Sequence, residues 1–247
     1  MSGHSKWSTI KHKKGALDKK RGKIFTKLIK EITVAAKEGG ADADMNPRLR
    51  LAVQNAKGKN MPKDTIDRAI KKVAGGEAAD YLEITYEGYA AHGIAVFVEC
   101  TTDNLNRTVA SVRSIFSKNG GALGTNGSLE FIFDRKGVFE MPFPDGQDED
   151  DLTLELIDGG AEDVEVEDGR MTITSAMEDF GNMQKKLEAL GLEAENAELE
   201  RIPKTYVSLS DVDFEKVLKT IDAFEDDDDV QKVFHNVEAS DAQLESL

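Results

Sequence analysis

The first 77 residues carry apolar and polar side chains at the spacing of amphipathic helices. Over residues 23–38 the apolar positions fall within one arc, and the opposite arc holds four lysines: Lys23, Lys27, Lys30 and Lys37. Gly39-Gly40 predicts the end of this helix, and Asn46-Pro47 predicts the N-cap and first residue of a second helix. Pro62 opens a third helix. The pattern predicts a three-helix bundle whose first helix offers a lysine stripe to solvent.

From Tyr81 onward the apolar positions recur every second residue, which is typical of strands. Strands are predicted over residues 81–89, 94–102 and 128–134. A helix is predicted over residues 104–121, with Thr102 or Asp103 as its N-cap.

Residues 135–202 follow the order strand, helix, strand, strand, helix, strand, which is the ferredoxin-like βαββαβ unit. A strand over 205–210, a helix over 213–225 and a strand over 230–238 could complete the sheet that begins at Tyr81. We therefore expect a multidomain fold of α and α+β class, with an inserted ferredoxin-like domain. The predicted domains are a basic helical bundle with a flexible tail, a discontinuous α+β domain and the insertion, at residues 1–78, 79–134 with 203–247, and 135–202.

Charge is strongly segregated along the chain, which has a net charge of −15. Residues 1–77 hold 19 Lys and Arg against 8 Asp and Glu, a net charge of +11, and the other 170 residues have a net charge of −26. Within residues 1–22 the net charge is +6, and these residues show almost no apolar periodicity. They should be poorly ordered until a partner binds. Such clustering of Lys and Arg is the electrostatic footprint of nucleic-acid binding.

The candidate nucleic-acid-binding residues share positive charge or the capacity to stack on bases. They are His4, Lys6, Trp7, Lys11, Lys13, Lys14, Lys19, Lys20, Arg21, Lys23, Lys27, Lys30, Arg48 and Arg50. Trp7 could equally dock on the helical bundle. Arg48 and Arg50, together with Gln54 and Arg68, are candidate readers of base edges in a DNA major groove.

The sequence shows no pattern for catalysis, cofactors or metals. It lacks a nucleophile elbow, a Walker A loop and a dinucleotide-binding fingerprint, and its one cysteine and four histidines have no zinc-site spacing. The glycine-rich stretch 119–128 favours turns over a phosphate loop, and the acidic run 225–229 is typical of a solvated loop. We expect a non-enzymatic protein without a cofactor or resident metal. No 18-residue apolar stretch predicts a membrane span, and the single thiol fits the cytoplasm.

The stretch TDNLNRT, residues 102–108, allows two interpretations. Asn104, Asn106 and Arg107 could cap the following helix and leave the arginine exposed, or they could contact a partner. Capping is the favoured interpretation.

Several stretches resemble the YebC/PmpR family over nearly the whole chain. They are GHSKW, RGKIFTKLIKEI, NPRLRLAV, MPKDTIDRAIKK, YEGY, TTDNLNRTVASVRSIFSKNGGALGTNGSLEFIF and DVQKVFHN. The mitochondrial relative of that family is the translational activator of cytochrome c oxidase. The resemblance implies three domains, with one α/β domain inserted in the other, and a bacterial cytoplasmic protein without catalytic activity.

The resemblance implies two alternative functions. The customary family label implies a DNA-binding transcriptional regulator. Other members resemble RNA-binding translation factors that help ribosomes through difficult sequences such as proline runs. The expected partner is nucleic acid, either DNA or ribosomal RNA with the ribosome, and neither a membrane nor a small-molecule substrate. A pure protein-interaction module ranks last, because it leaves the basic segment unexplained.

Overall fold

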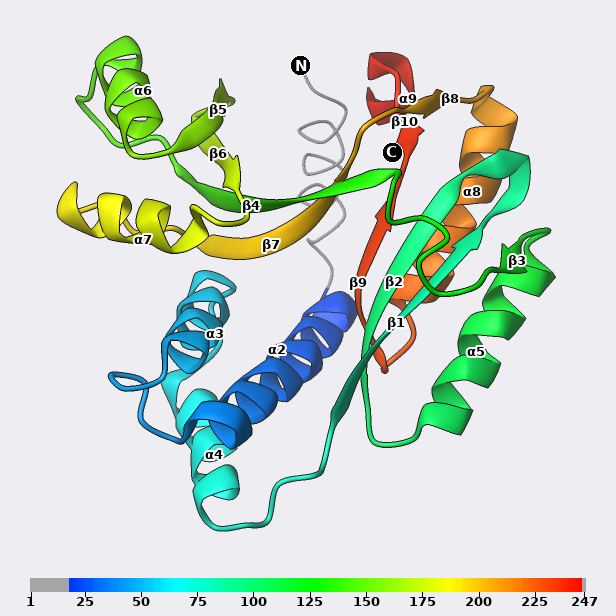
Figure 1. Ribbon diagram of the computed structural model, residues 1–247, viewed down its shortest axis with the longest axis horizontal. Helices are drawn as coiled ribbons and strands as arrows, with labels where there is room; N and C mark the ends of the chain where they lie inside the picture. The colour runs from blue at the N-terminus through cyan, green and yellow to red at the C-terminus, as the bar shows by residue number, and fades with distance from the viewer. Residues whose placement is uncertain (1–17, 246–247) are drawn as a thin grey trace. The chain divides into compact units, whose positions relative to one another are not determined.

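The computed structural model describes residues 18–245, and Figure 1 shows their helices and strands. The expected mixture of a helical N-terminal region and α+β sheets is confirmed, with two four-stranded sheets and a two-stranded pair among the described residues. Residues 1–17 of the expected flexible tail lie outside the described residues, and the expectation is wrong for residues 18–22, which form the first part of helix α2. The chain folds into two compact units, each defined by the contacts among its own residues. Among the described residues, unit 1 comprises 18–34, 75–134 and 202–245, and unit 2 comprises 35–74 and 135–201.

The three predicted N-terminal helices are present as α2 (Asp18–Gly39), α3 (Pro47–Gly58) and α4 (Lys63–Ala74). Asn46 caps α3 as expected, because its side-chain oxygen accepts the Leu49 N–H at 3.0 Å. The buried Asn46 amide also donates to the carbonyl oxygens of Ala35 and Gly40, at 2.7 and 2.8 Å. This one side chain therefore starts α3 and ties it to the end of α2.

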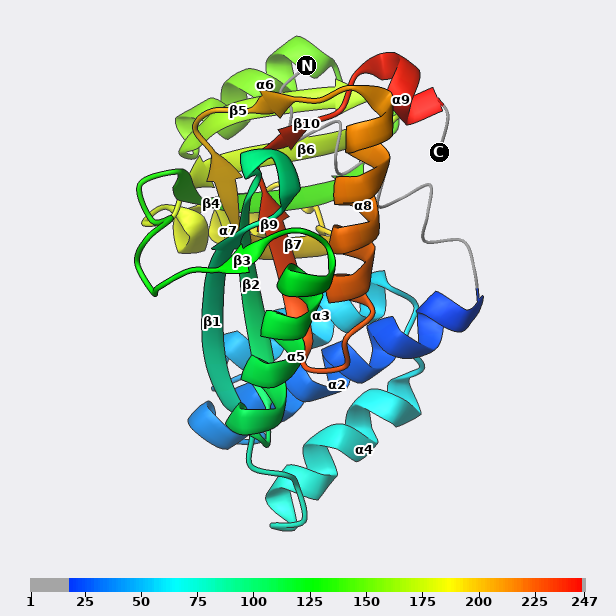
Figure 2. The same cartoon turned by 90° about the vertical axis from the view of Figure 1, so that its right-hand side faces the viewer.

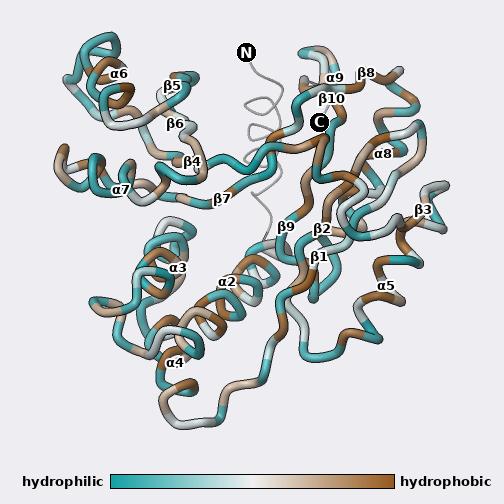
Figure 3. The backbone as a smooth tube through the Cα atoms, viewed as in Figure 1, coloured by the Kyte–Doolittle hydropathy of each residue, from teal (hydrophilic) through white to brown (hydrophobic). Residues whose placement is uncertain are grey.

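Unit 1 contains a sheet in the order β3-β1-β2-β9, and one face of that sheet is covered by two helices. Figure 2 shows α5 and α8 in front of β1, β2 and β9, and Figure 3 shows apolar positions recurring along both helices. Phe116 of α5 and Phe224 of α8 meet edge to face in this core, with ring centroids 4.8 Å apart. The elements are β1 (Leu82–Tyr89), β2 (Ala95–Thr102), α5 (Leu105–Lys118), β3 (Ala122–Leu123), α8 (Asp211–Glu225) and β9 (Val230–His235), with a 3₁₀ turn at Ala91–Gly93.

The predicted strand over residues 128–134 is wrong. Residues 124–132 form turns, and β4 (Phe133–Pro142) begins only at the end of that stretch. The cause is Glu87, which is 2% exposed and accepts the N–H groups of Gly127 and Leu129 at 2.8 and 2.6 Å. These two hydrogen bonds hold the segment in a folded loop, and its apolar Leu129 fills a second core instead of alternating along a strand.

The strand expected over residues 205–210 is reduced to β8 (Val207–Ser208). It pairs in parallel with β10 (Val237–Glu238) and does not join the sheet of β1, whereas β9 pairs with β2 as expected. The chain then ends its described part in α9 (Asp241–Glu245).

Unit 2 contains the predicted βαββαβ unit. Its sheet has the order β5-β6-β4-β7, which is the ferredoxin-like strand order, and α6 and α7 pack on one face. The other elements are α6 (Glu149–Asp158), β5 (Ala161–Glu167), β6 (Arg170–Ala176), α7 (Phe180–Ala189) and β7 (Asn196–Pro203).

Helix α3 packs against the ferredoxin-like sheet within unit 2. The buried Asn55 side chain donates to the Ala197 carbonyl and accepts the Ala197 N–H, both at 2.9 Å, so it pairs with β7 as a neighbouring strand would. Gly58 lies so close to the backbone of Glu195 that a Cβ there would be 1.8 Å from the Glu195 oxygen. Only glycine allows this approach. The described contacts therefore place α3 with residues 135–201, while the three-domain division predicted from the sequence stays a prediction.

Candidate nucleic-acid interface

Three lysines of α2 turn toward the segment that joins α8 to β9 in unit 1. Lys23 Nζ lies 2.9 Å from the Asp226 carbonyl oxygen and 2.8 Å from its carboxylate, and Lys27 Nζ lies 2.9 Å from the Glu225 carbonyl oxygen. Glu225 is the last residue of α8, so these carbonyls are the ones that a helix C-terminus leaves without intrahelical partners. Cations are favoured there by the helix dipole. The lysine stripe thus caps α8.

Lys30 is the third member of this stripe, and it is only 8% exposed. Its Nζ lies 3.0 Å from the Thr101 carbonyl, 2.6 Å from the Asp228 carbonyl and 3.1 Å from Asp229 Oδ1. The Tyr81 ring centroid is 5.4 Å away. An ammonium group is buried only when it is paired and hydrogen-bonded, and Lys30 meets that condition. The expectation that the α2 lysines form a solvent-facing stripe is therefore wrong for Lys30.

Asp229 is the centre of the contacts around Lys30. Its side chain also accepts from Arg107 Nε at 2.9 Å, from Arg107 Nη2 at 2.7 Å and from Thr108 Oγ1 at 2.9 Å. Burial raises the pKa of Asp229, but the hydrogen bonds from Arg107, Thr108 and Lys30 outweigh it and hold the pKa below its ordinary value of 3.8. The acidic run 225–229 is therefore only partly solvated: Asp226 and Asp228 are exposed, but Asp229 is a buried, ionised anchor.

The stretch TDNLNRT has a structural role in these contacts. Asn104, not Thr102 or Asp103, caps α5, since its side-chain oxygen accepts the Arg107 N–H at 3.0 Å. The Thr102 hydroxyl instead accepts the Asn104 N–H at 2.9 Å, and its oxygen lies 2.8 Å from the Thr108 hydroxyl oxygen. The favoured capping interpretation agrees with this geometry. Arg107 is about half exposed, but it is paired with Asp103 as well as Asp229.

The arginines of α3 are exposed and bound locally. Arg48 forms an ion pair with Glu38, and Arg50 donates from Nε to the Ala43 carbonyl at 3.1 Å and from Nη2 to the Asp44 carbonyl at 2.7 Å. Their charges still face solvent. Gln54, by contrast, donates to a main-chain carbonyl of unit 2 at 2.9 Å, so its amide is already engaged within the fold.

Helix α4 carries exposed basic residues that are not among the nucleic-acid-binding residues predicted from the sequence. Lys63, Lys71 and Lys72 are exposed, and within residues 18–245 none of them forms a salt bridge. Ile66 and Ala69 are buried, and Lys71 lies on the opposite side of the helix from them. The sequence signal for them is the cluster of lysines between the apolar positions of residues 63–74.

The remaining candidates lie at or beyond the start of the described chain. His4, Lys6, Trp7, Lys11, Lys13 and Lys14 lie outside the described residues, and the side chains of Lys19 and Lys20 are not described either. Arg21 is exposed, with its guanidinium carbon 5.7 Å from the centroid of the Phe25 ring.

The described residues offer little for other chemistry. Within residues 18–245 no group of three or more His, Cys, Asp and Glu side chains could hold a metal ion. Cys100 is buried, and burial, with Asp227 and Asp229 nearby, raises its pKa to about 12, so the thiol stays protonated at neutral pH. No helix in this part of the chain is long and apolar enough to cross a membrane.

Comparison with known proteins identifies the family. Residues 5–76 match the model of the TACO1/YebC protein N-terminal domain, and residues 81–237 match that of the TACO1/YebC second and third domain. The chain belongs to the TACO1/YebC family, as its sequence motifs predict.

Similar proteins carry a regulatory name. A "probable transcriptional regulatory protein" of Amoebophilus asiaticus is 57% identical over 96% of this chain and 98% of its own length. Another, from a Geobacter species, is 52% identical over the full length of both chains. A crystal structure of a conserved hypothetical protein from Aquifex aeolicus has a TM-score of 0.81 at 42% identity and covers 91% of this chain and 93% of its own.

Proposed function

We propose that this protein is a nucleic-acid-binding regulator of gene expression and that its basic N-terminal region makes the contact. The observation that carries the proposal is the charge segregation, with a net charge of +6 in residues 1–22 on a chain whose last 170 residues have a net charge of −26. Its relatives named above carry a regulatory name and no enzymatic one.

The contacts of the described basic residues support assigning this role to some of them rather than to others. Lys23, Lys27 and Lys30 bind main-chain and carboxylate oxygens of unit 1, so they are better suited to hold the fold than to reach phosphates. We assign the contact to the lysines and arginine of residues 6–21, to Arg48 and Arg50, whose side chains are exposed, and to the exposed lysines of α4. Phosphate contacts from these residues supply affinity, not sequence choice.

The ferredoxin-like sheet is unsuited to bind nucleic acid in the way of an RNA-recognition domain. On the face away from α6 and α7, Glu165, Thr172 and Glu140 lie side by side across three strands. This row has two carboxylates and no aromatic ring, whereas RNA-binding sheets of this type stack bases on aromatic side chains. This face of the ferredoxin-like sheet lacks side chains that stack on bases, so we assign binding to the basic region.

Two nucleic-acid partners fit the proposal. The names of the relatives favour a transcriptional regulator on DNA. The acidic body favours RNA within the ribosome, because there only a basic tip needs to approach the phosphates while the rest of the protein stays away.

The first experiment measures binding of a labelled 20-base-pair duplex and of a hairpin RNA by fluorescence anisotropy across a salt series. The variant Lys13→Gln with Lys14→Gln should weaken binding and reduce the slope of log K against log salt on the duplex by about 0.9 for each lost phosphate contact. The matched control is Lys118→Gln with Lys219→Gln, two exposed lysines on α5 and α8, which should leave the slope unchanged. An unaltered slope in the first variant rejects the assignment.

A second experiment separates the two partners. Lysate is sedimented on a sucrose gradient at physiological salt, with and without RNase, and the protein is located by blotting. Migration with ribosomal particles that RNase abolishes supports the translation factor. Migration only at the top, with salt-sensitive capture of particular genomic duplexes, supports the transcriptional regulator.

A further inference from the structure

The outer face of α6 exposes apolar side chains that the core of unit 2 does not use. Leu154 is 63% and Ile157 is 50% exposed, while Leu152 and Leu156 on the inner face are 5% and 0% exposed. Residues three apart lie next to each other on a helix, so Leu154 and Ile157 form one patch. A single exposed leucine is ordinary, but two adjacent ones on a surface helix call for an explanation.

Carboxylates surround this patch. By helical geometry, Asp150 and Asp158 lie on the same face as the two apolar residues. Acids in the first turn of α6 are favoured by the helix dipole, and Asp148 caps that end. The dipole does not explain Glu155 and Asp158, because they lie in the last turns, where negative charge is disfavoured and no basic residue is present. The acidic rim is therefore not a requirement of the helix itself.

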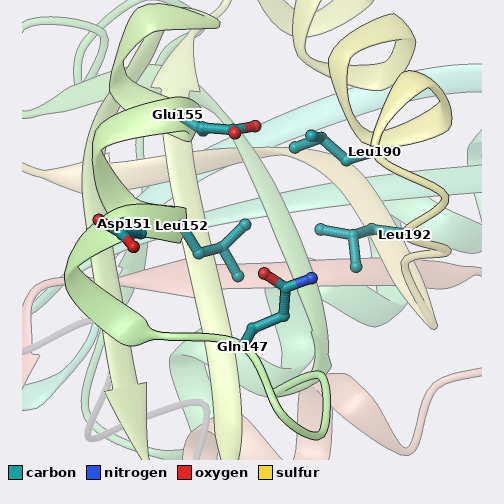
Figure 4. Close-up of a pocket in the computed structure, with 6 residues that line it drawn as sticks. All are labelled: Gln147, Asp151, Leu152, Glu155, Leu190 and Leu192. Carbon is teal, nitrogen blue, oxygen red and sulfur yellow. The ribbon is translucent and has the colours of Figure 1, made fainter.

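A narrow groove runs along the flank of the same helix. Figure 4 shows Asp151, Leu152 and Glu155 of α6 on one side, Leu190 and Leu192 on the other, and Gln147 at one end. Its volume is about 110 Å³, well below that of pockets for drug-sized ligands. The groove has an apolar floor and a carboxylate edge, which suits a single long side chain with an apolar stem and a cationic head.

The fold already contains one contact of this type. Lys186 of α7 reaches Glu155, with Nζ 3.6 Å from its carboxylate. Asp151 is exposed, and among the described residues it forms no salt bridge. A second cation could therefore bind at Asp151 without displacing Lys186.

We propose that the outer face of α6 and its flanking groove, defined by Asp151, Leu154, Glu155, Ile157 and Leu190, dock a lysine- or arginine-rich amphipathic segment of a partner protein. The apolar side of the segment covers Leu154 and Ile157, and one basic side chain enters the groove beside Asp151. Charge complementarity selects the partner, because this rim repels nucleic acid and anionic lipid and attracts a cationic peptide. The surface is a second function, separate from nucleic-acid binding by the basic N-terminal region.

The test uses the full chain and a synthetic 16-residue helical peptide with leucines at positions i, i+3, i+4 and i+7 and lysines elsewhere. Binding is followed by isothermal titration and by NMR on isotopically labelled protein. We expect the strongest shifts at residues 147–158 and 190–192. Leu154→Ser with Ile157→Ser, and separately Asp151→Asn, should each weaken binding about tenfold. Both sites are exposed, so these variants keep the fold, and circular dichroism checks this.

Matched controls distinguish this surface from general attraction to an acidic protein. Val212→Ser alters an apolar residue that is 65% exposed at the acidic start of α8, and it should leave peptide affinity unchanged. A peptide with glutamates in place of the lysines should not bind. The α6 variants should keep the salt slope measured with the nucleic acids, so the outcome is independent of the proposed function.

Three results would overturn the proposal. The first is peptide binding that Val212→Ser weakens as much as the α6 variants do. The second is a set of NMR shifts that avoids α6. The third is tighter binding of a peptide of residues 1–22 together with concentration-dependent dimerisation in sedimentation, which would make the occupant a second copy of this chain.

Discussion

Replacing Asp229 with asparagine removes the buried negative charge on which Lys30 and Arg107 converge. The substitution keeps the size of the side chain, but it turns one acceptor oxygen into a donor among Lys30 and Arg107, whose charged groups can only donate. The Asp229 and Lys30 side chains are 6% and 10% exposed, so water cannot replace the lost partner. Leaving one member of a buried ion pair uncompensated costs about 3–5 kcal/mol. We expect a loss of that size in the free energy of unfolding of unit 1.

The measurement is urea unfolding followed by near-ultraviolet circular dichroism. All four tyrosines, Tyr81, Tyr86, Tyr89 and Tyr206, belong to unit 1, so the tyrosine contribution to the signal reports on that unit. Replacing Lys30 with methionine in the Asp229→Asn background removes the unpaired charge and should recover part of the loss. The coupling between the two changes is read from the double-mutant cycle.

The control is Asp226→Asn, the same chemical change three residues earlier in the same acidic run. The Asp226 and Lys23 side chains are 66% and 38% exposed, and such a pair contributes at most about 1 kcal/mol. If Asp229→Asn destabilises the protein no more than Asp226→Asn does, the buried contacts between Lys30 and Asp229 do not stabilise unit 1.

Three further predictions concern pH and the packing of α3. The pKa of Asp229 is lower in the folded state than in the unfolded state, so its stabilising contribution is complete above pH about 4 and is lost as the pH falls through the folded pKa. The difference in unfolding free energy between wild type and Asp229→Asn should therefore shrink below pH about 4. Urea titrations at a series of pH values measure it. Asn55→Ala leaves the buried N–H and carbonyl of Ala197 without partners and should cost about 2–4 kcal/mol, with faster hydrogen exchange at the Ala197 amide. Gly58→Ala places a Cβ 1.8 Å from the Glu195 oxygen and should lower the thermal unfolding midpoint by several degrees.

Each of these has its own contradicting result. A constant difference between wild type and Asp229→Asn from pH 7 to pH 3 would mean that Asp229 has an ordinary pKa in the folded state. Unchanged exchange at Ala197 would show that the Asn55 pairing is dispensable. Gly22→Ala is the control for Gly58→Ala, since among the described residues beyond its own helical turn no atom lies within 4 Å of the new Cβ, and alanine favours a helix. Equal midpoints in the two variants would exclude the close packing of α3.

The sequence alone determined the local structure and much of its order. Three signals located α2, α3 and α4, namely helical periodicity, the Asn46-Pro47 start and the paired glycines. The order of helical and strand-like patterns along residues 135–202 indicated the ferredoxin-like unit. These features depend on neighbours within a few residues, and so a linear pattern contains them. The charge segregation that supports the proposed function is also a property of the sequence.

Only the tertiary structure decided which faces meet. Lys30 and Asp229 are 199 positions apart, and the helical pattern of α2 cannot show that its lysine arc faces an acidic run near the end of the chain. The sequence pattern likewise cannot show that Asn55 pairs with β7. Nor can it show that Glu87 holds residues 127–129 in a loop, although their pattern predicts a strand. A charged or polar side chain has the same periodicity whether it faces water or a buried partner. Its role is set by distant groups, and these become neighbours only when the chain folds.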